Sequence, residues 1–157
     1  MKYILLQISS NMNPNQQVEL RVVDETDLEF LYKLLEKRDP VANISHKKMP
    51  SYEEHVQFVL SKPYSVWYVI IANYERVGSI YLSKQDEIGI LLTSDMTGKG
   101  VGKIAIGILM TKNPRTRYLA NINPKNKKSM EFFEKNGFRL IQYTYEIMKQ
   151  DSNLSKE

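Results

Sequence analysis

The stretch Glu87-Ile-Gly-Ile-Leu-Leu92, followed after a short gap by Thr97-Gly-Lys-Gly-Val-Gly-Lys103, decides how this chain folds. Its apolar first half is typical of a strand, and the three alternating glycines precede an apolar helical run, Val101–Met110. Glycine accepts a positive φ angle and lets a ligand approach the backbone. Free N–H groups at a helix N-terminus bind anions, and Lys99 and Lys103 add positive charge. The stretch therefore predicts a diphosphate site, with a plain glycine-rich helix cap as the alternative.

Two common nucleotide motifs do not fit this loop. A P-loop has two glycines four residues apart followed by Lys and Ser or Thr, whereas Ile104 follows Lys103 here. The dinucleotide fingerprint follows the first strand of its fold, whereas this loop follows the fourth strand that the pattern predicts. Both nucleotide classes are therefore disfavoured.

Strand and helix patterns continue on both sides of the loop. Ser51 and Glu54 form a capping box for a helix, and Gly137 ends another as a C′ glycine. The patterns predict strands at 18–23, 64–72, 77–83, 86–92, 118–122, 138–141 and 143–148, and helices at 24–38, 51–61, 101–112 and 127–136. This order predicts a mixed sheet with helices on both faces, and a ligand at the carboxyl end of a strand.

The composition excludes several classes of protein. The 157 residues include 22 basic and 18 acidic ones, a net charge of +4 without a basic stripe, which suits a small anionic ligand better than a nucleic acid. The absence of cysteine excludes disulfides, thiolate metal sites and a cysteine nucleophile. His46 and His55 form no metal signature, so no metal is expected. No apolar run approaches the ~20 residues of a membrane helix, so we expect a cytoplasmic protein with no membrane contact.

Three segments together resemble one known family, the GCN5-related N-acetyltransferases (GNAT). Residues 97–103 resemble its pyrophosphate loop, residues 87–92 its fourth strand, and residues 126–138 its Asn-x-x-Ala/Ser…Tyr-x-x-x-Gly-Phe segment. The resemblance implies an α/β fold with a mixed, mostly antiparallel central sheet of about seven strands, helices on both faces, and a splay between strands four and five. The resemblance covers nearly the whole chain and implies one acetyltransferase-like domain over 18–150. A short apolar run followed by a polar loop predicts a leader strand or loop over 1–17, and a polar tail follows over 151–157.

The resemblance also assigns residues to the cofactor, acetyl-CoA. The backbone of three strand residues would pair with the pantetheine arm like an added strand, and these are Ile90, Leu91 and Leu92. The pyrophosphate would lie on the loop, which comprises Thr97, Gly98, Lys99, Gly100, Val101, Gly102 and Lys103. Asn126, Ser129 and Phe133 would contact the cofactor nearer its thiol end. A helix N-cap is the alternative role for Asn126.

Two positions depart from the family pattern. Thr97 stands where Gln or Arg is usual, so one side-chain contact is lost. Phe133 stands where the family often has a tyrosine that protonates the leaving thiolate, and phenylalanine cannot donate a proton. Either Tyr143 or Tyr145 on the terminal strands serves instead, or water does, or turnover is poor.

The resemblance implies an acetyl-CoA-dependent N-acetyltransferase, with direct attack by an amine in a ternary complex. Glu87 is the candidate base, because the attacking amine must lose a proton. His46 and Trp67 are candidate acceptor contacts, whereas His55 is expected to pack in a helix. Residues 51–55 with Trp67 faintly resemble enzymes that acetylate amino sugars in the pseudaminic acid pathway.

The expected acceptor is a small-molecule primary amine such as an amino sugar, an amino acid derivative or a polyamine. A protein N-terminus or lysine is the alternative acceptor. A non-catalytic acyl-CoA-binding or sensing module is the alternative outside the enzymes, and Thr97 and Phe133 favour it. The chain is expected to be a monomer or a homodimer.

Overall fold

The computed structural model describes residues 17–42 and 48–147, and its centre is an antiparallel sheet. The strands pair in the order β1-β2-β3-β4. Their bounds are β1 Val18–Val22, β2 Val66–Ala72, β3 Glu75–Leu82 and β4 Ile88–Leu92. The β2–β3 hairpin turns at Asn73 and Tyr74, whose φ angles of 51° and 68° match the left-handed turns that follow the twist of a hairpin.

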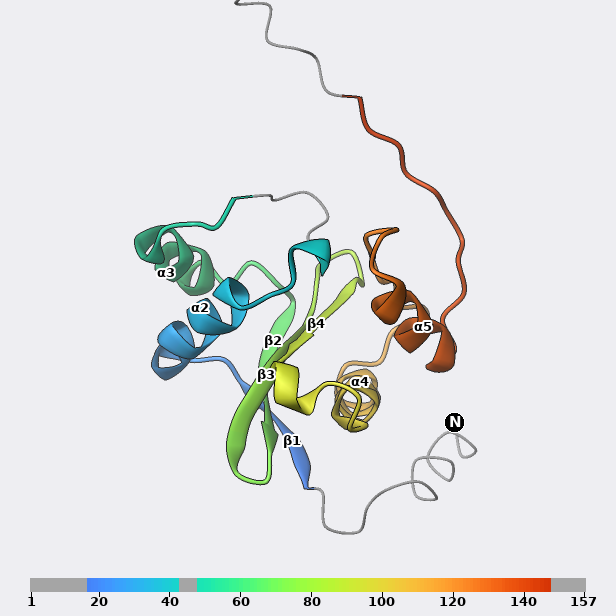
Figure 1. The fold of residues 1–157 in the computed structure, drawn as a ribbon. Coiled ribbons are helices and arrows are strands. Elements are labelled where there is room, and N and C mark those ends of the chain that lie inside the picture. The colour runs from blue at the N-terminus through green and yellow to red at the C-terminus, as the bar shows by residue number, and fades with distance from the viewer. Residues whose placement is uncertain (1–16, 43–47, 148–157) are drawn as a thin grey trace, which may run out of the picture.

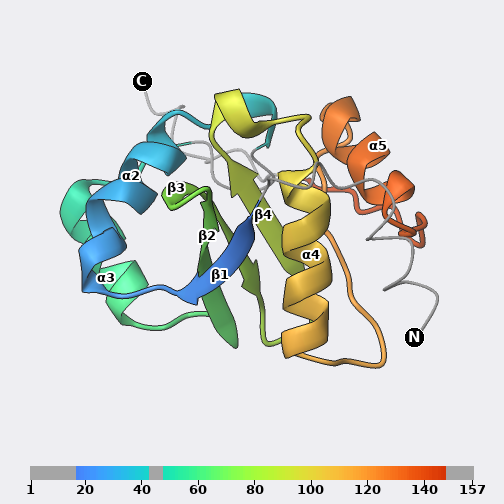
Figure 2. The ribbon, with the colours of Figure 1, turned by 90° about the horizontal axis from the view of Figure 1, so that it is seen from below.

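Helices cover both faces of the sheet, as the sequence predicts (Figures 1 and 2). Helices α2 and α3 lie on one face, and α4 and α5 lie on the other. The helices and short 3₁₀ turns are η1 Glu25–Asp27, α2 Leu28–Glu36, η2 Pro40–Ala42, α3 Tyr52–Leu60, η3 Ser94–Met96, α4 Val101–Lys112 and α5 Lys127–Lys135. None of the helices in the described part of the chain is long and apolar enough to cross a membrane.

The expectation of about seven strands is wrong for the described residues, where the sheet has four. Of the predicted strand 118–122, one parallel bridge forms, between Glu87 and Leu119. The predicted strands 138–141 and 143–148 do not form over the described residues, which run past α5 without regular structure (Figure 1). A strand needs the backbone of a second segment as partner, and the alternating side-chain pattern of a segment does not supply one.

The core lies between the sheet and α4. Helix α4 is apolar on most of its circumference, and Val101, Ala105 and Leu109 are fully buried against the sheet. A helix with this composition is stable only inside a protein, because each buried Val or Leu contributes about 1.5–3 kcal/mol. This packing fixes the N-terminus of α4 beside the end of β4, where the glycine loop joins them.

A buried carboxylate ties the start of α2 to the sheet. Asp27 is 0% exposed, and its carboxylate accepts hydrogen bonds from Arg21 of β1 at 2.6 and 3.0 Å. Arg76 of β3 reaches the same carboxylate at 3.2 Å, and the backbone N–H of Asp24 donates to it at 3.0 Å. The single carboxylate of Asp27 therefore connects β1 and β3 to the start of α2.

Acid should destabilise the protein through His55, a buried residue of α3. Its ring Nε2 lies 3.0 Å from the carbonyl oxygen of Leu28, and burial lowers the pKa of His55 below its ordinary value. The unfolded chain therefore binds a proton more readily than the folded one, and the free energy of unfolding falls as the pH drops below about 6.5.

The measurement is urea unfolding at pH 7.5, 6.5 and 5.5 for the wild type and for His55→Gln. The glutamine variant keeps a donor for Leu28 but does not titrate, and His46 is present in both proteins, so its contribution cancels. We expect a steeper loss of stability with falling pH in the wild type. Parallel curves would contradict a buried neutral histidine.

Candidate active site

The loop between β4 and α4 bends through two glycines that require their own backbone geometry. Gly98 has a φ of 79° and Gly100, the N-cap of α4, has a φ of 83°. A Cβ atom built on either glycine meets nothing within 4 Å, so the requirement is the backbone angle, not lack of space. The space beside both glycines is therefore open to a ligand.

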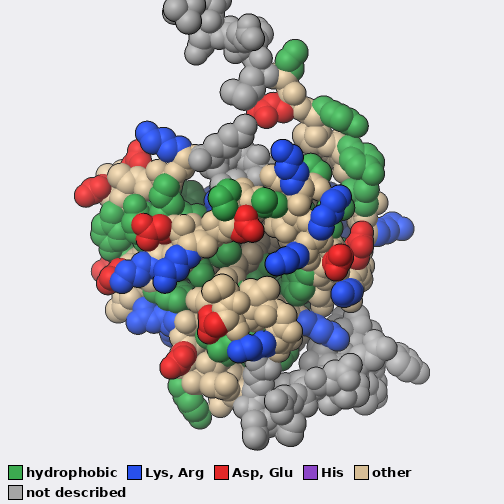
Figure 3. Space-filling model, viewed as in Figure 1, with side chains coloured by type: hydrophobic (Ala, Val, Ile, Leu, Met, Phe, Trp, Pro, Cys, Tyr) green, Lys and Arg blue, Asp and Glu red, His purple; other side chains and the backbone are tan. Residues whose placement is uncertain are grey.

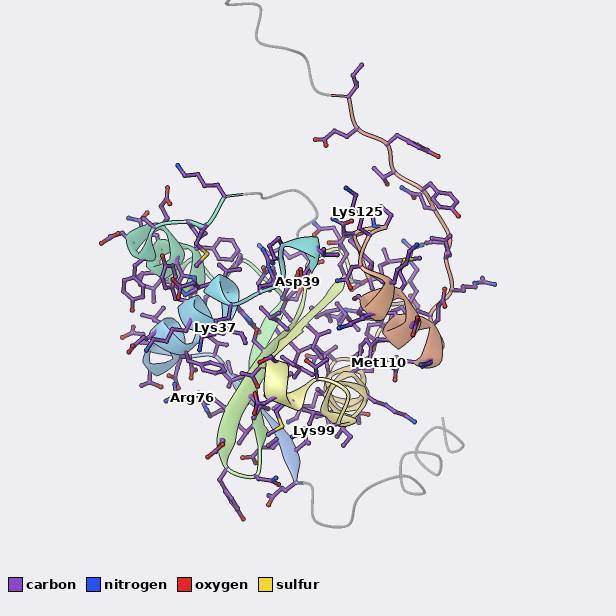
Figure 4. All side chains as sticks on the ribbon, in the orientation of Figure 1. Lys37, Asp39, Arg76, Lys99, Met110 and Lys125 are labelled. Carbon is purple, nitrogen blue, oxygen red and sulfur yellow. The ribbon has the colours of Figure 1, made fainter. Side chains whose placement is uncertain are left out.

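The first turn of α4 presents free donors to this space. In the described part of the chain, the backbone N–H groups of Val101, Gly102 and Lys103 have no protein acceptor, and Gly100 supplies no side-chain cap. Lys99 and Lys103 are exposed, and Figure 4 places Lys99 on the loop beside α4. Figure 3 shows Lys and Arg side chains spread over this face of the molecule. Free N–H donors at a helix N-terminus with lysines beside them favour the binding of an anion.

Gly102 has a different role from the other two glycines. A Cβ at this position would lie 3.0 Å from the ring of Phe132 in α5 and 3.6 Å from Cδ1 of Ile90 in β4. The glycine therefore lets α4, α5 and β4 approach one another. Sequence analysis singled out Phe133 of α5, and the structure places its neighbour Phe132 at this junction.

The edge of β4 that faces away from β3 forms one isolated bridge, between Glu87 and Leu119, among the described residues. Ser83 N–H, just after β3, donates to Glu87 C=O, and Thr93 N–H donates to Val77 C=O of β3, so the backbone groups of the odd-numbered residues face β3. The even-numbered residues face the other edge, where Ile88 N–H donates to Leu119 at 2.8 Å. The backbone groups of Ile90 and Leu92 have no partner there among the described residues. Of the three predicted residues, Ile90 and Leu92 therefore offer their backbone to a ligand, and Leu91 does not.

Glu87 lies at the start of β4 and is held from two sides. Its Oε1 accepts a hydrogen bond from Asn121 Nδ2 at 2.7 Å, and its Oε2 accepts one from the Ser83 hydroxyl at 3.3 Å. Asn121 follows the bridge at Leu119 and so spans the gap beside β4. The sequence alone does not indicate Asn121 and Ser83 as partners of Glu87, because only the tertiary fold brings them to the carboxylate.

An aromatic row crosses the sheet on the face of Glu87. Trp67 of β2 pairs with Tyr81 of β3, and Tyr81 pairs with Gly89 of β4. The Tyr81 ring covers Gly89, because a Cβ built there would overlap the Tyr81 ring. Tyr64 stacks on Tyr81 at 3.8 Å, and burial raises the pKa of both hydroxyl groups. The sequence pattern could not show which of these aromatic side chains gather into one cluster.

The remaining predicted residues have mixed placements. Asn126 caps α5 by accepting from Ser129 N–H at 3.1 Å, as its alternative role predicts. Phe133 is buried in the core against Phe132 and Phe138. Tyr143 and Tyr145 are 74% and 92% exposed, and the structure does not gather them with Glu87 or the loop. His46 lies outside the described residues.

Comparisons with known proteins agree with this geometry. A family model described as an acetyltransferase (GNAT) domain matches residues 17–139. A search of curated proteins finds no match. Among solved structures, a domain from Methanocaldococcus jannaschii aligns with a TM-score of 0.72 and 24% identity over 83% of this chain and 94% of the other.

Two structures with stated activities also share the fold. An aminoglycoside N-acetyltransferase in complex with CoA aligns with a TM-score of 0.65 and 15% identity, over 89% of this chain and 99% of the other. A spermidine N-acetyltransferase from Vibrio cholerae aligns with a TM-score of 0.62 and 17% identity, over 78% and 80%. At these identities the likeness establishes the fold and leaves the acceptor open.

Proposed function

Since the chain belongs to the GNAT acetyltransferase family and is an acyltransferase that uses acetyl-CoA, we propose that its acceptor is the primary amine of a small molecule. The amine attacks directly in a ternary complex of enzyme, acetyl-CoA and acceptor. The observation that carries the proposal is the position of Glu87 beside the open edge of β4, with its carboxylate held by two neighbours. Spermidine and aminoglycosides are the acceptors named for two similar structures.

The described residues fit the cofactor in two places. The open space at Gly98 and Gly100, with the free N–H groups of the first turn of α4, suits a pyrophosphate. The free backbone of Ile90 and Leu92 suits the amides of a pantetheine arm, which need partners once they are buried. When bound, acetyl-CoA supplies an acetyl group activated as a thioester.

The chain's own groups then handle protons. An amine is protonated near neutral pH, and Glu87 accepts the proton that the ammonium must lose before attack. Asn121 and Ser83 fix the direction of the carboxylate. Phe133 is buried and has no ionisable proton, and Tyr143 and Tyr145 are exposed and lie away from Glu87 and the glycine loop, so we propose water as the proton donor to the thiolate.

Glu87→Gln should lower kcat/KM for the amine by about 10²–10⁴-fold, the usual contribution of a general base. The dissociation constant of acetyl-CoA should not change, because the glutamine removes a proton acceptor and leaves the loop intact. The measurement is thiol release over a panel of amines, together with calorimetric titration of acetyl-CoA.

Glu75→Gln is the matched control, because Glu75 is an exposed glutamate at the start of β3, in the same sheet. It should behave as the wild type does. A Glu87→Gln enzyme with an unchanged kcat/KM would remove Glu87 from the mechanism.

One observation favours a second function. The buried, non-ionisable Phe133 stands at a position where the family often has its proton donor, which suits a module that binds acyl-CoA without transferring the acetyl group. The same two measurements separate the functions. Saturable acetyl-CoA binding with no thiol release from any amine supports the silent module, whereas release with any amine supports the enzyme.

A further inference from the structure

The charge beside the aromatic cluster of Tyr64, Trp67 and Tyr81 is positive, because it comes from Arg38, and a positive charge repels a polycationic acceptor. Arg38, which lies between α2 and η2, is half-buried, and Figure 4 labels its chain neighbours Lys37 and Asp39. Burial raises the pKa of Tyr64 and of Tyr81, and the positive charge of Arg38 opposes that rise in both. Arg38 therefore interacts electrostatically with both hydroxyl groups, and the Tyr81 hydroxyl lies over Gly89 of β4.

Arg38 has no carboxylate partner in the described part of the chain. Arg21 and Arg76 share Asp27, and Arg115 pairs with Asp86 at 2.9 Å. A guanidinium loses hydration when it is half-buried, and proteins normally compensate the loss with an anion. An unpaired arginine beside a ligand site is therefore available for an anionic group of the ligand.

The aromatic cluster holds a second unused donor. The Trp67 ring lies edge-on to Tyr64 at 5.0 Å and to Phe58 at 6.1 Å, and its Nε1–H is buried with no acceptor among the described residues. A buried indole N–H usually has a partner. Among the residues that the structure describes, Arg38 has no carboxylate partner and the Trp67 Nε1–H has no acceptor.

We propose that the acceptor carries an anionic group, a carboxylate or a phosphate, in addition to its amine, and that Arg38 binds this group over the Tyr64–Tyr81 stack. This inference rests on the proposed function, because it places the amine at Glu87. The acceptor is a zwitterion with an apolar or ring-shaped body that packs on the aromatic cluster, and Trp67 donates to an oxygen of it. Polycations such as polyamines lack the group that Arg38 binds.

Trp67 makes the inference measurable without catalysis, because it is the single tryptophan of the chain. Its fluorescence is followed while CoA-saturated protein is titrated with matched pairs of amines. The carboxylate arm compares L-phenylalanine with 2-phenylethylamine, and the phosphate arm compares glucosamine 6-phosphate with glucosamine. Spermidine is the polycation. Acetyl transfer is read separately by thiol release, so a failure of the proposed function does not decide this result.

In at least one arm the anionic member should bind about 10- to 100-fold more tightly than its partner, as a charge-assisted hydrogen bond predicts. Arg38→Gln should abolish this preference and should strengthen the binding of spermidine, whereas Arg38→Lys should retain part of it. Lys37→Gln, which removes the exposed neighbouring charge, should change neither. Equal binding within both pairs, or a preference that survives Arg38→Gln, would overturn the proposal.

Discussion

Gly100→Glu should lower the affinity for acetyl-CoA by about 100-fold or more, the largest change in binding that we expect from a single substitution in this chain. The new carboxylate would lie where the first turn of α4 presents its free N–H groups, and like charges repel the pyrophosphate. The substitution also forces a side chain onto a residue with a φ of 83°. Calorimetric titration of acetyl-CoA measures the effect.

Gly137→Glu is the matched control for this experiment. Gly137 has a φ of 87°, and a Cβ there also meets nothing within 4 Å, so the strain and the added charge are the same. It lies after the C-cap of α5, away from the loop, and the affinity for acetyl-CoA should stay at the wild-type value. If Gly100→Glu binds acetyl-CoA as tightly as Gly137→Glu, or if the wild type shows no binding, the cofactor site is assigned to the wrong loop.

Local signals in the sequence predicted most of the elements. The capping box of Ser51 and Glu54 starts α3, the left-handed Gly137 follows α5, and Gly100 caps α4. Each of these depends on residues within one turn of one another, and short-range geometry is what a sequence pattern encodes. The anion site at α4 was predicted for the same reason.

The prediction of two C-terminal strands was wrong for the described residues, and local signals could not have corrected it. Ile141, Tyr143, Tyr145 and Ile147 alternate with polar residues, the pattern of a half-buried strand. The structure leaves these apolar side chains exposed, because no described segment pairs with them. Alternating polar and apolar residues show that a segment could join a sheet. They do not show whether a second strand is available to pair with it.

The side-chain contacts on the face of the sheet that carries Glu87 could not be predicted from local sequence signals either. The sequence does not distinguish Gly89 from an ordinary strand glycine, and only the register of β3 with β4 places the Tyr81 ring over it. Phe132 and Phe133 are adjacent in the sequence but point about 100° apart on α5, so one meets Gly102 and the other fills the core. Cross-strand register and helix rotation are properties of the packed molecule.

Asp27→Asn should lower the free energy of unfolding by about 3 kcal/mol, the low end of the range for a broken buried ion pair. The low end applies because the side chains of Arg21 and Arg76 are 40% and 42% exposed and keep part of their hydration. The asparagine has nearly the same shape, so the change isolates the charge. The lost energy is a large part of the 5–15 kcal/mol that holds an ordinary domain folded.

Urea unfolding at pH 7, followed by the fluorescence of Trp67, measures this effect, and Asp24→Asn is its control. Asp24 also pairs with Arg21, at 2.9 Å, but its side chain is 56% exposed, and an asparagine can still cap the turn. A surface pair of this kind contributes little to stability, because solvent screens it. Both variants remove a carboxylate partner of Arg21, and Asp27→Asn also removes the partner of Arg76, so the difference between the two losses reports the buried pairs of Asp27. Equal losses would mean that Arg21 and Arg76 do not depend on Asp27, and that apolar packing alone joins α2 to the sheet.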